Sequence, residues 1–108
     1  MSFYVGRRTK MGPDVTVDGE ILDPKLNLRN HSPTGFDWGY CGSGPAQLAL
    51  AILAHHCESD EEALDLYQRF KWSVIANLPR IGWNLSARQI DEALERIRAN
   101  ETARGGTT

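Results

Sequence analysis

The sequence predicts an α+β domain, in which a small antiparallel sheet of three to four strands is followed by three helices. Short runs of β-branched and aromatic residues, separated by turn residues, occupy the first thirty positions. Further along the chain, apolar residues recur instead with helical spacing, between recognisable helix start and stop signals. Strands and helices in separate blocks are typical of α+β folds and not of doubly wound ones.

Four segments have the composition of strands: 3–8 (FYVGRR), 15–17 (VTV), 20–22 (EIL) and 25–30 (KLNLRN). Asp18-Gly19, between the second and the third, predicts a tight hairpin because both residues tolerate a positive φ. The fourth segment alternates cleanly, with Leu26 and Leu28 on one face and polar residues on the other. We therefore expect three or four short antiparallel strands that share one apolar face.

The segment 31–44 (HSPTGFDWGYCGSG) is the main irregular part of the chain. Loops of this length inside compact domains are often functional. Alternatively, Phe36, Trp38 and Tyr40 alternate as a short strand and pack inward, so that the segment is an ordered crossover. For Trp38, and for Trp83 in a later loop, we favour packing against the core.

The first helix is predicted to begin at Pro45, with Ser43 or Gly44 as its cap, and to run to about His56. Its apolar residues cover every side, which is typical of a helix that lies buried at the centre of its domain. We therefore expect this helix to be the middle of the core.

The second and third helices open at Ser59 and Ser86, each followed three residues later by a residue of the capping-box type, Glu62 and Gln89. A broad apolar stripe continues through the second helix until Pro79 ends it. The third helix has a narrow apolar stripe and an otherwise charged surface.

Length and charge limit the class of protein. The 108 residues fit one domain over 1–100, and the segment 101–108 (ETARGGTT) has no apolar anchor, so we expect a disordered tail there. A net charge of −2 gives no global positive field that would draw the chain to nucleic acid or membrane. The longest apolar run is shorter than the roughly 20 residues of a membrane span, and the first residues lack the apolar region of a signal peptide.

The two cysteines, Cys41 and Cys57, flank the first helix and should lie ~20 Å apart, too far for a disulfide. Two unpaired thiols favour a cytoplasmic protein. Cys41 precedes a helix N-terminus, where a thiol pKa can be lowered, but only His31 could approach it as a base. The adjacent residues 55–57 (HHC) fan out around the helix, so no metal site is expected there. Since no catalytic constellation is found in the sequence, neither an enzyme nor a cofactor is expected.

A glycine-rich frame before the first helix is one candidate binding site, formed by Trp38, Tyr40, Gly42, Ser43 and Gly44. Backbone N–H groups at a helix N-terminus can bind an anion, which would make this a site for a small anionic ligand. The alternative is turn chemistry that only directs the chain into the helix.

Two further sets of residues are candidates for contact with a macromolecule. Trp72 is expected on the polar face of the second helix beside Arg69, and exposed tryptophan with arginine is typical of interaction hot spots. The alternative is that the third helix or the sheet covers Trp72. Arg7, Arg8 and Lys10 form a basic cluster at the end of the first strand, which could contact phosphates or an acidic protein surface. An ordinary solvated strand end is the alternative for this cluster.

Four blocks together resemble a family of small uncharacterised proteins: YVGRR, VTVDGEIL, FDWGYCGSGPAQLALAIL and YQRFKWSVIANLP. The resemblance extends from Tyr4 to Pro79, and members of the family come from phages, plasmids and genomic islands. The family often has glycine at the position of Cys41, which implies a backbone role for the loop and counts against a thiol mechanism. The resemblance implies a mobile-element context and no established activity.

The leading hypothesis is a small non-enzymatic binding module of a mobile genetic element, which acts by protein–protein interaction. Inhibition of a host defence system, as by anti-CRISPR proteins, is one form that such an activity could take. The alternatives are a nucleic-acid-binding accessory protein and a small anionic-ligand site at the glycine-rich loop. No membrane partner is expected, and the oligomeric state is left open.

Overall fold

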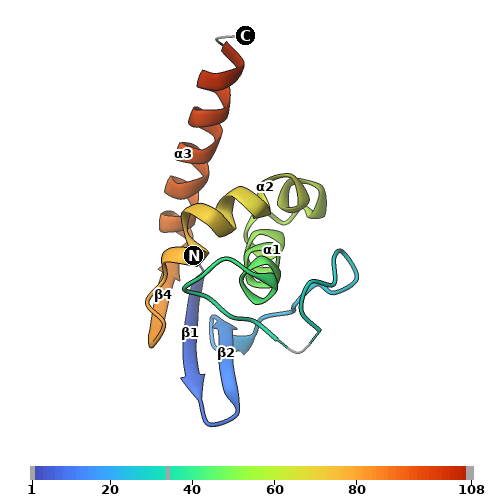
Figure 1. The fold of residues 1–108 in the computed structure, drawn as a ribbon, viewed down its shortest axis with the longest axis vertical. Coiled ribbons are helices and arrows are strands. Elements are labelled where there is room, and N and C mark those ends of the chain that lie inside the picture. Colours follow the sequence, from blue (N-terminus) through green and yellow to red (C-terminus); the bar gives the residue numbers. More distant parts are fainter. Residues whose placement is uncertain (1, 34, 107–108) are drawn as a thin grey trace.

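The chain folds as a four-stranded antiparallel sheet with three helices, in a computed structural model that describes residues 2–33 and 35–106, with side chains to residue 100 (Figure 1). The prediction of an α+β fold is therefore confirmed. In chain order the elements are β1 (Phe3–Thr9), β2 (Gly12–Val17), β3 (Glu20–Ile21), α1 (Ser43–Cys57), α2 (Asp60–Ser73), the 3₁₀ turn η1 (Ile75–Asn77), β4 (Gly82–Ser86) and α3 (Ala87–Gly106).

The sheet has the strand order β3-β2-β1-β4, so the last strand of the chain pairs with the first. Gly6 lies opposite Val15 on one side and Trp83 on the other. The predicted hairpin at Asp18-Gly19 is confirmed, since φ is 52° at Asp18 and 86° at Gly19. Buried and exposed residues alternate along β2 and β4, which gives the sheet one apolar face.

The strand predicted at 25–30 is wrong. Lys25 has a φ of 57° and its carbonyl accepts a hydrogen bond from the amide of Leu28, so the backbone turns where an extended strand was expected. Leu26 remains 36% exposed. The fourth strand is β4 instead, which extends the sheet beside β1 and buries Trp83 and Leu85.

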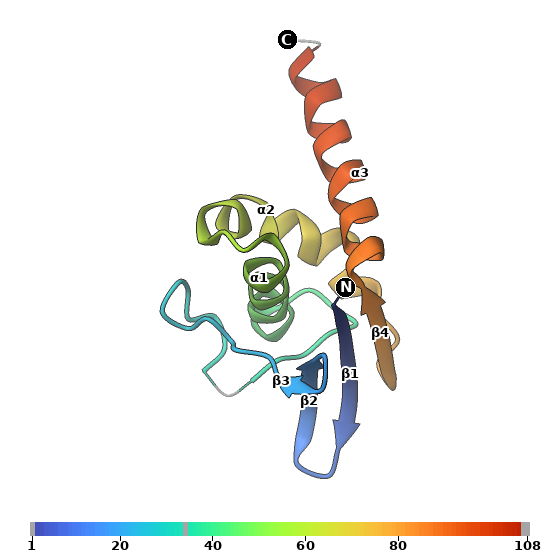
Figure 2. The same cartoon turned by 180° about the vertical axis from the view of Figure 1, so that it is seen from behind.

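Helix α1 lies at the centre of the molecule, between the sheet and α2 (Figures 1 and 2). Every residue from 44 to 54 is buried, as the all-round apolar pattern predicts. The helix begins at Ser43, two residues before the predicted start. Its N-cap is Gly42, which has no side chain, so no side-chain hydrogen bond caps the first turn. The first predicted helix is therefore confirmed, with a shifted boundary.

The capping box predicted at Ser86 is complete, whereas at Ser59 only the serine cap forms and the Glu62 carboxylate pairs with Arg98. The Ser59 hydroxyl accepts from the amide of Glu62, and at the start of α3 the side chains of Ser86 and Gln89 each accept from the other residue's amide. Helix α2 ends at Ser73, earlier than Pro79, because the chain tightens into η1 after Val74.

Helix α3 projects from the body of the molecule, with its last turns beyond the other elements (Figure 2). Its buried residues, from Ile90 to Ile97, form the narrow stripe that the sequence predicts. Helix α3 extends to Gly106. The side chains of residues 101–108 lie outside the described part of the structure, so the disorder expected for this segment stays a prediction.

Candidate binding site

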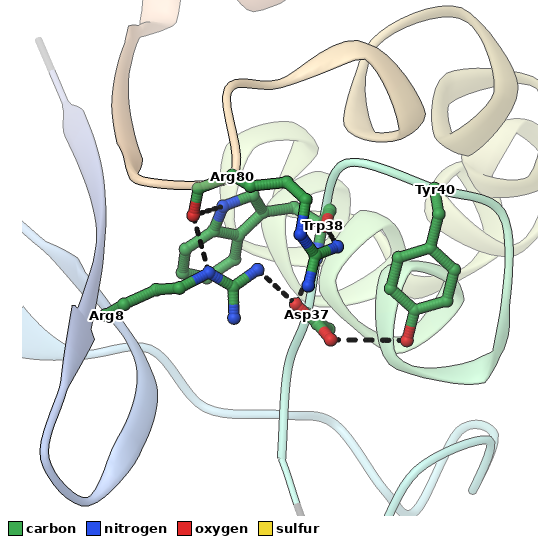
Figure 3. A network of polar contacts seen from close by, with 5 residues as sticks. All are labelled: Arg8, Asp37, Trp38, Tyr40 and Arg80. Atoms are coloured by element: carbon green, nitrogen blue, oxygen red, sulfur yellow. Dashed lines mark hydrogen bonds and ion pairs between the residues drawn. The ribbon is translucent and has the colours of Figure 1, made fainter.

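A network of polar contacts joins the loop before α1 to the end of β1 and to the turn before β4 (Figure 3). The Arg8 guanidinium is its centre. Its Nη2 donates to Oδ1 of Asp37 at 2.7 Å, and its Nε donates to the carbonyl of Arg80 at 2.5 Å. The same guanidinium lies 4.6 Å from the centre of the Trp38 ring, in a cation–π contact. One side chain therefore connects three segments that are far apart in the sequence.

Trp38 anchors the loop from inside. Its side chain is fully buried, and its ring meets that of Trp83 edge to face, with the centroids 5.6 Å apart. The indole N–H donates to the Arg80 carbonyl at 3.1 Å, and Nη1 of Arg80 donates back to the Trp38 carbonyl at 3.1 Å. These reciprocal bonds fix the loop to the turn before β4, so packing against the core is confirmed for both tryptophans.

Gly39 follows Trp38 at a position that only glycine fits. Its φ is +84°, and its amide donates to the carbonyl of Ile75 in η1 at 3.0 Å. A Cβ atom there would lie 2.7 Å from Cγ of Arg80. The loop is an ordered crossover, as one of the two sequence interpretations holds, although the residues 36–40 form no strand.

Asp37 is the negative charge of the network. Burial would raise the pKa of this carboxyl, but hydrogen bonds from Arg8 and from the amide of Trp38 outweigh burial and hold the pKa below its ordinary value. The Tyr40 hydroxyl donates to Oδ2 of Asp37 at 3.2 Å, and burial together with this carboxylate raises the pKa of Tyr40. At neutral pH the pair is therefore a carboxylate and a neutral phenol.

An open pocket of about 340 Å³ adjoins the network, between the β1–β2 hairpin, the loop and the start of α1. It is lined by Pro13, Ser32, Gly35, Phe36, Asp37, Tyr40, Ser43 and Gly44. The Asp37 backbone packs so closely against Gly44 that a Cβ on this glycine would lie 3.2 Å from the Asp37 nitrogen. The pocket wall therefore contains both the N-terminus of α1 and the carboxylate of Asp37.

The predicted basic cluster is divided by the strand. Arg8 points toward the loop and is paired with Asp37, whereas Arg7, the next residue along β1, lies on the opposite face of the sheet and is exposed. Lys10 stands in the turn that joins β1 to β2. The three residues therefore do not form one solvated patch.

The predicted glycine-rich frame is brought together with Arg8. Trp38 and Tyr40 belong to the network, Ser43 and Gly44 line the pocket, and Gly42 is the N-cap of α1. Sequence reasoning missed Asp37 and Arg80, which complete the network.

Trp72 lies on another element, at the end of α2, and its side chain is 64% exposed. The Nζ of Lys71 is 5.4 Å from its ring centre. Arg69 donates from Nη2 to the backbone carbonyl of Asp65 and is also within 3.8 Å of the Asp65 carboxylate. Among the described residues, neither α3 nor the sheet covers Trp72, so of the two alternatives that the sequence left open the exposed one is observed.

Three large apolar side chains are exposed in the segments that the network joins or next to them, and others, such as Phe3 and Ile21, are exposed elsewhere. Met11 in the hairpin turn is 97% exposed, Ile81 before β4 is 86% exposed and Tyr40 is 43% exposed. Together with Lys10 and Arg80 we call these three residues the hairpin-end surface. The sequence gives one indication that Ile81 is exposed, since it is an apolar residue in the turn 79–82 (PRIG), where no core residue is needed.

The three histidines all have hydrogen-bond partners inside the fold. His31 contacts the Tyr67 hydroxyl at 2.8 Å, His55 contacts the Tyr4 hydroxyl at 2.6 Å, and His56 contacts Asp91 at 2.6 Å. Burial raises the pKa of Tyr4 far above its ordinary value, so this hydroxyl stays protonated. His31, the one histidine that the sequence allowed as a base for Cys41, is therefore hydrogen-bonded to Tyr67 of α2.

Both cysteines are free. Burial raises the pKa of the Cys57 thiol, as expected for a structural cysteine. Among residues 2–33 and 35–100, no group of three histidine, cysteine or acidic side chains is placed to hold a metal ion.

The fold and the network define a small α+β domain with a surface loop that Arg8, Trp38 and Arg80 connect to the sheet. The sequence profile of DUF6166, a family of unknown function, matches residues 4–96, and the chain belongs to this family. Searches of curated proteins and of solved structures found no match. In the part of the chain that the structure describes, no helix is long and apolar enough to cross a membrane.

Proposed function

We propose that the protein is a non-enzymatic binding module that acts by protein–protein contact through the hairpin-end surface. The observation that supports this most directly is the exposure of Met11, Ile81 and Tyr40 around the buried Trp38 anchor. Aromatic and arginine side chains that are already held in place lose little conformational freedom when a partner binds. The Arg8 network supplies this rigidity, since it fixes the loop from two sides before any partner arrives.

We further propose a cytoplasmic protein of a mobile genetic element, with inhibition of a host defence system as one form of its activity. The support for the context is the resemblance of four sequence blocks to proteins of phages, plasmids and genomic islands. The two free cysteines suit a reducing compartment.

A nucleic-acid-binding role is less well supported. The Asp37 carboxylate offsets the charge of Arg8, and Arg7 faces away from Arg8 across the sheet. Phosphate binding draws its affinity from several cations that act together, and the cluster does not present them on one face.

A small anionic ligand at the start of α1 is also less well supported. The pocket there contains the uncapped helix N-terminus, which favours an anion. It contains the Asp37 carboxylate as well, which stays charged because its pKa is lowered. None of the described residues that line the pocket is a cation, so nothing in this lining offsets the repulsion of a second anion there.

Photo-crosslinking from single positions tests the proposed function. A benzophenone amino acid at Ile81 should give one dominant cross-linked protein in cells that carry the gene. The same group at Asn27, an exposed turn residue away from the network, is the control and should not give that product. The variant Ile81→Asp, which changes an 86% exposed side chain, should lose the partner in pull-down while it keeps its fold. If neither Ile81 nor Trp72 yields a specific product, the proposed function is wrong; a product from Trp72 alone would move the contact to α2.

A further inference from the structure

We propose that the hairpin-end surface recognises a protein segment that carries carboxylates together with apolar side chains. This inference rests on the proposed function and adds the chemistry of the partner to it. It follows from the combination of exposed apolar groups with positive charges that the fold itself leaves uncompensated.

The apolar part of the surface is Met11 and Ile81, which are almost entirely exposed. They belong to two turns at the same end of the sheet, because the β1 residue Arg7 lies opposite the β4 residue Gly82 in the register. Pro13, just after the hairpin turn, lines the same pocket as Tyr40, so the hairpin and the loop are neighbours. A partner that covers this end would remove these side chains from water, which favours binding.

The charged part of the surface is Lys10 and Arg80. Neither has a carboxylate within ion-pair distance among the side chains of residues 2–33 and 35–100, whereas Arg8 has Asp37. Arg80 is held in position all the same, because it donates to the Trp38 carbonyl and its guanidinium lies 5.6 Å from the Tyr40 ring centre. A fixed cation beside exposed apolar side chains fits a carboxylate on an otherwise apolar segment.

Two carboxylates lie near the hairpin end, Asp37 paired with Arg8 and Asp14 opposite Arg7 in the register, but a larger acidic cluster lies elsewhere on the molecule. The first turn of α2 holds Asp60, Glu61 and Glu62, and with Asp65 and Ser59 the two glutamates line an open acidic hollow. An acidic partner is repelled there and attracted to the hairpin end, so the charge distribution of the chain orients it.

Nucleic acid fits this surface less well, and a second copy of the chain is another occupant that the test must distinguish. Phosphates would pair with the two cations but leave Met11 and Ile81 in water. A second copy could offer the acidic start of α2 or the exposed Ile21 between Glu20 and Asp23, and it would reveal itself as a dimer that depends on protein concentration. Both occupants are outcomes of the test.

Titration of the ¹⁵N-labelled protein, followed by NMR, tests the inference. The probes are a synthetic peptide with alternating Asp/Glu and Leu/Phe residues, the same peptide with Lys in place of each acid, and a 20-base DNA in single- and double-stranded form. The variant Lys10→Glu/Arg80→Glu removes the cations, and Arg88→Glu/Arg96→Glu, on the exposed face of α3, is a control with the same change in charge. We expect saturable shifts at residues 8–13, 37–42 and 79–82 with the acidic peptide only.

The first variant should weaken this binding about tenfold or more, and the control variant should leave it within about twofold. The inference is overturned by no shift at millimolar acidic peptide, by equal binding of the lysine peptide, by tighter binding of DNA, or by a concentration-dependent dimer that occupies the same residues. Cross-linking from Ile81 separates the two proposals. A specific cross-linked partner with no response to the acidic peptide leaves the proposed function standing and removes only the partner's chemistry.

Discussion

The loop at 36–42 and the end of α2 each present a tryptophan, and the two are built in opposite ways. Trp38 is fully buried, with its indole N–H bonded and its ring between Arg8 and Trp83, whereas Trp72 is 64% exposed beside Lys71. Trp38 holds the surrounding loop in place although it is not itself exposed, whereas Trp72 is exposed and holds no other described segment in place. Exposure of one aromatic residue is thus a weaker indication of a binding site than an ordered frame that holds several exposed residues.

The largest contrast is expected when each tryptophan is truncated. Trp38→Ala should lower the free energy of unfolding by about 3–5 kcal/mol, because it leaves a cavity and removes the anchor of the loop. Trp72→Ala, its matched control, should change it by less than about 0.5 kcal/mol. Urea unfolding measures both, and similar losses for the two variants would contradict the comparison.

A smaller effect is expected from Gly6→Ala on the strand below the anchor. The new Cβ would lie 2.3 Å from Cε2 of Trp83, which packs in turn against Trp38. Overpacking of this kind should cost about 1–3 kcal/mol in thermal or urea unfolding. Asn84→Ala, at an exposed position of β4, should change the stability by less than about 0.5 kcal/mol. A neutral Gly6→Ala would show that Trp83 can move, and that the anchor is not rigid.

The next effect separates two neighbours in the sequence. Arg8→Ala should lose about 1–2 kcal/mol of stability, since it removes hydrogen bonds to Asp37 and to the Arg80 carbonyl. Arg7→Ala, on the other face of β1, should be close to neutral. Chemical denaturation of both variants is the measurement, and equal losses would mean that the ion pair does not hold the loop.

The helix start at α3 provides a comparison outside the network. Ser86→Ala should cost about 1 kcal/mol, because Ser86 and Gln89 cap each other's amides. Ser73→Ala, whose hydroxyl only donates to a carbonyl within α2, should cost less. Denaturation midpoints that rank Ser73→Ala above Ser86→Ala would contradict the assigned cap.

The smallest effect is a dependence on pH. The folded pKa of Asp37 is lowered, so its stabilising contribution is fully present above its unfolded pKa of about 3.9 and is lost as the pH falls through the folded value. The difference in stability between the wild type and Asp37→Asn should therefore be constant from pH 7 to about pH 5 and shrink below about pH 4. A difference that grows in acid would contradict the direction of this pKa shift.

Local chemistry in the sequence accounts for the parts of the fold that were predicted. The Asp18-Gly19 turn, the serine caps at Ser59 and Ser86 and the all-round apolar α1 depend on residues within a few positions of one another. The strand at 25–30 failed because the left-handed Lys25 breaks it, and a clean alternation does not reveal such a turn. Strand β4 was missed because its partner, β1, is about eighty residues away in the sequence.

The candidate site follows the same rule. Trp38 and Tyr40 drew attention by residue type, but Asp37 and Arg80 gain their meaning only through Arg8, which is 29 and 72 positions away from them. The exposed Met11 and Ile81 have no sequence signal stronger than a position in a turn. Contacts between distant segments therefore decide which of the predicted residues act together.

A double-mutant cycle between Arg8 and Asp37 tests the central claim, that the loop is fixed to the sheet before any partner binds. The four proteins are the wild type, Arg8→Ala, Asp37→Ala and the double variant, with the free energy of unfolding measured at pH 7. We predict a coupling of about 1 kcal/mol or more, since the two side chains are 2.7 Å apart and about a quarter exposed. Additive losses, with a coupling below about 0.3 kcal/mol, would contradict the claim.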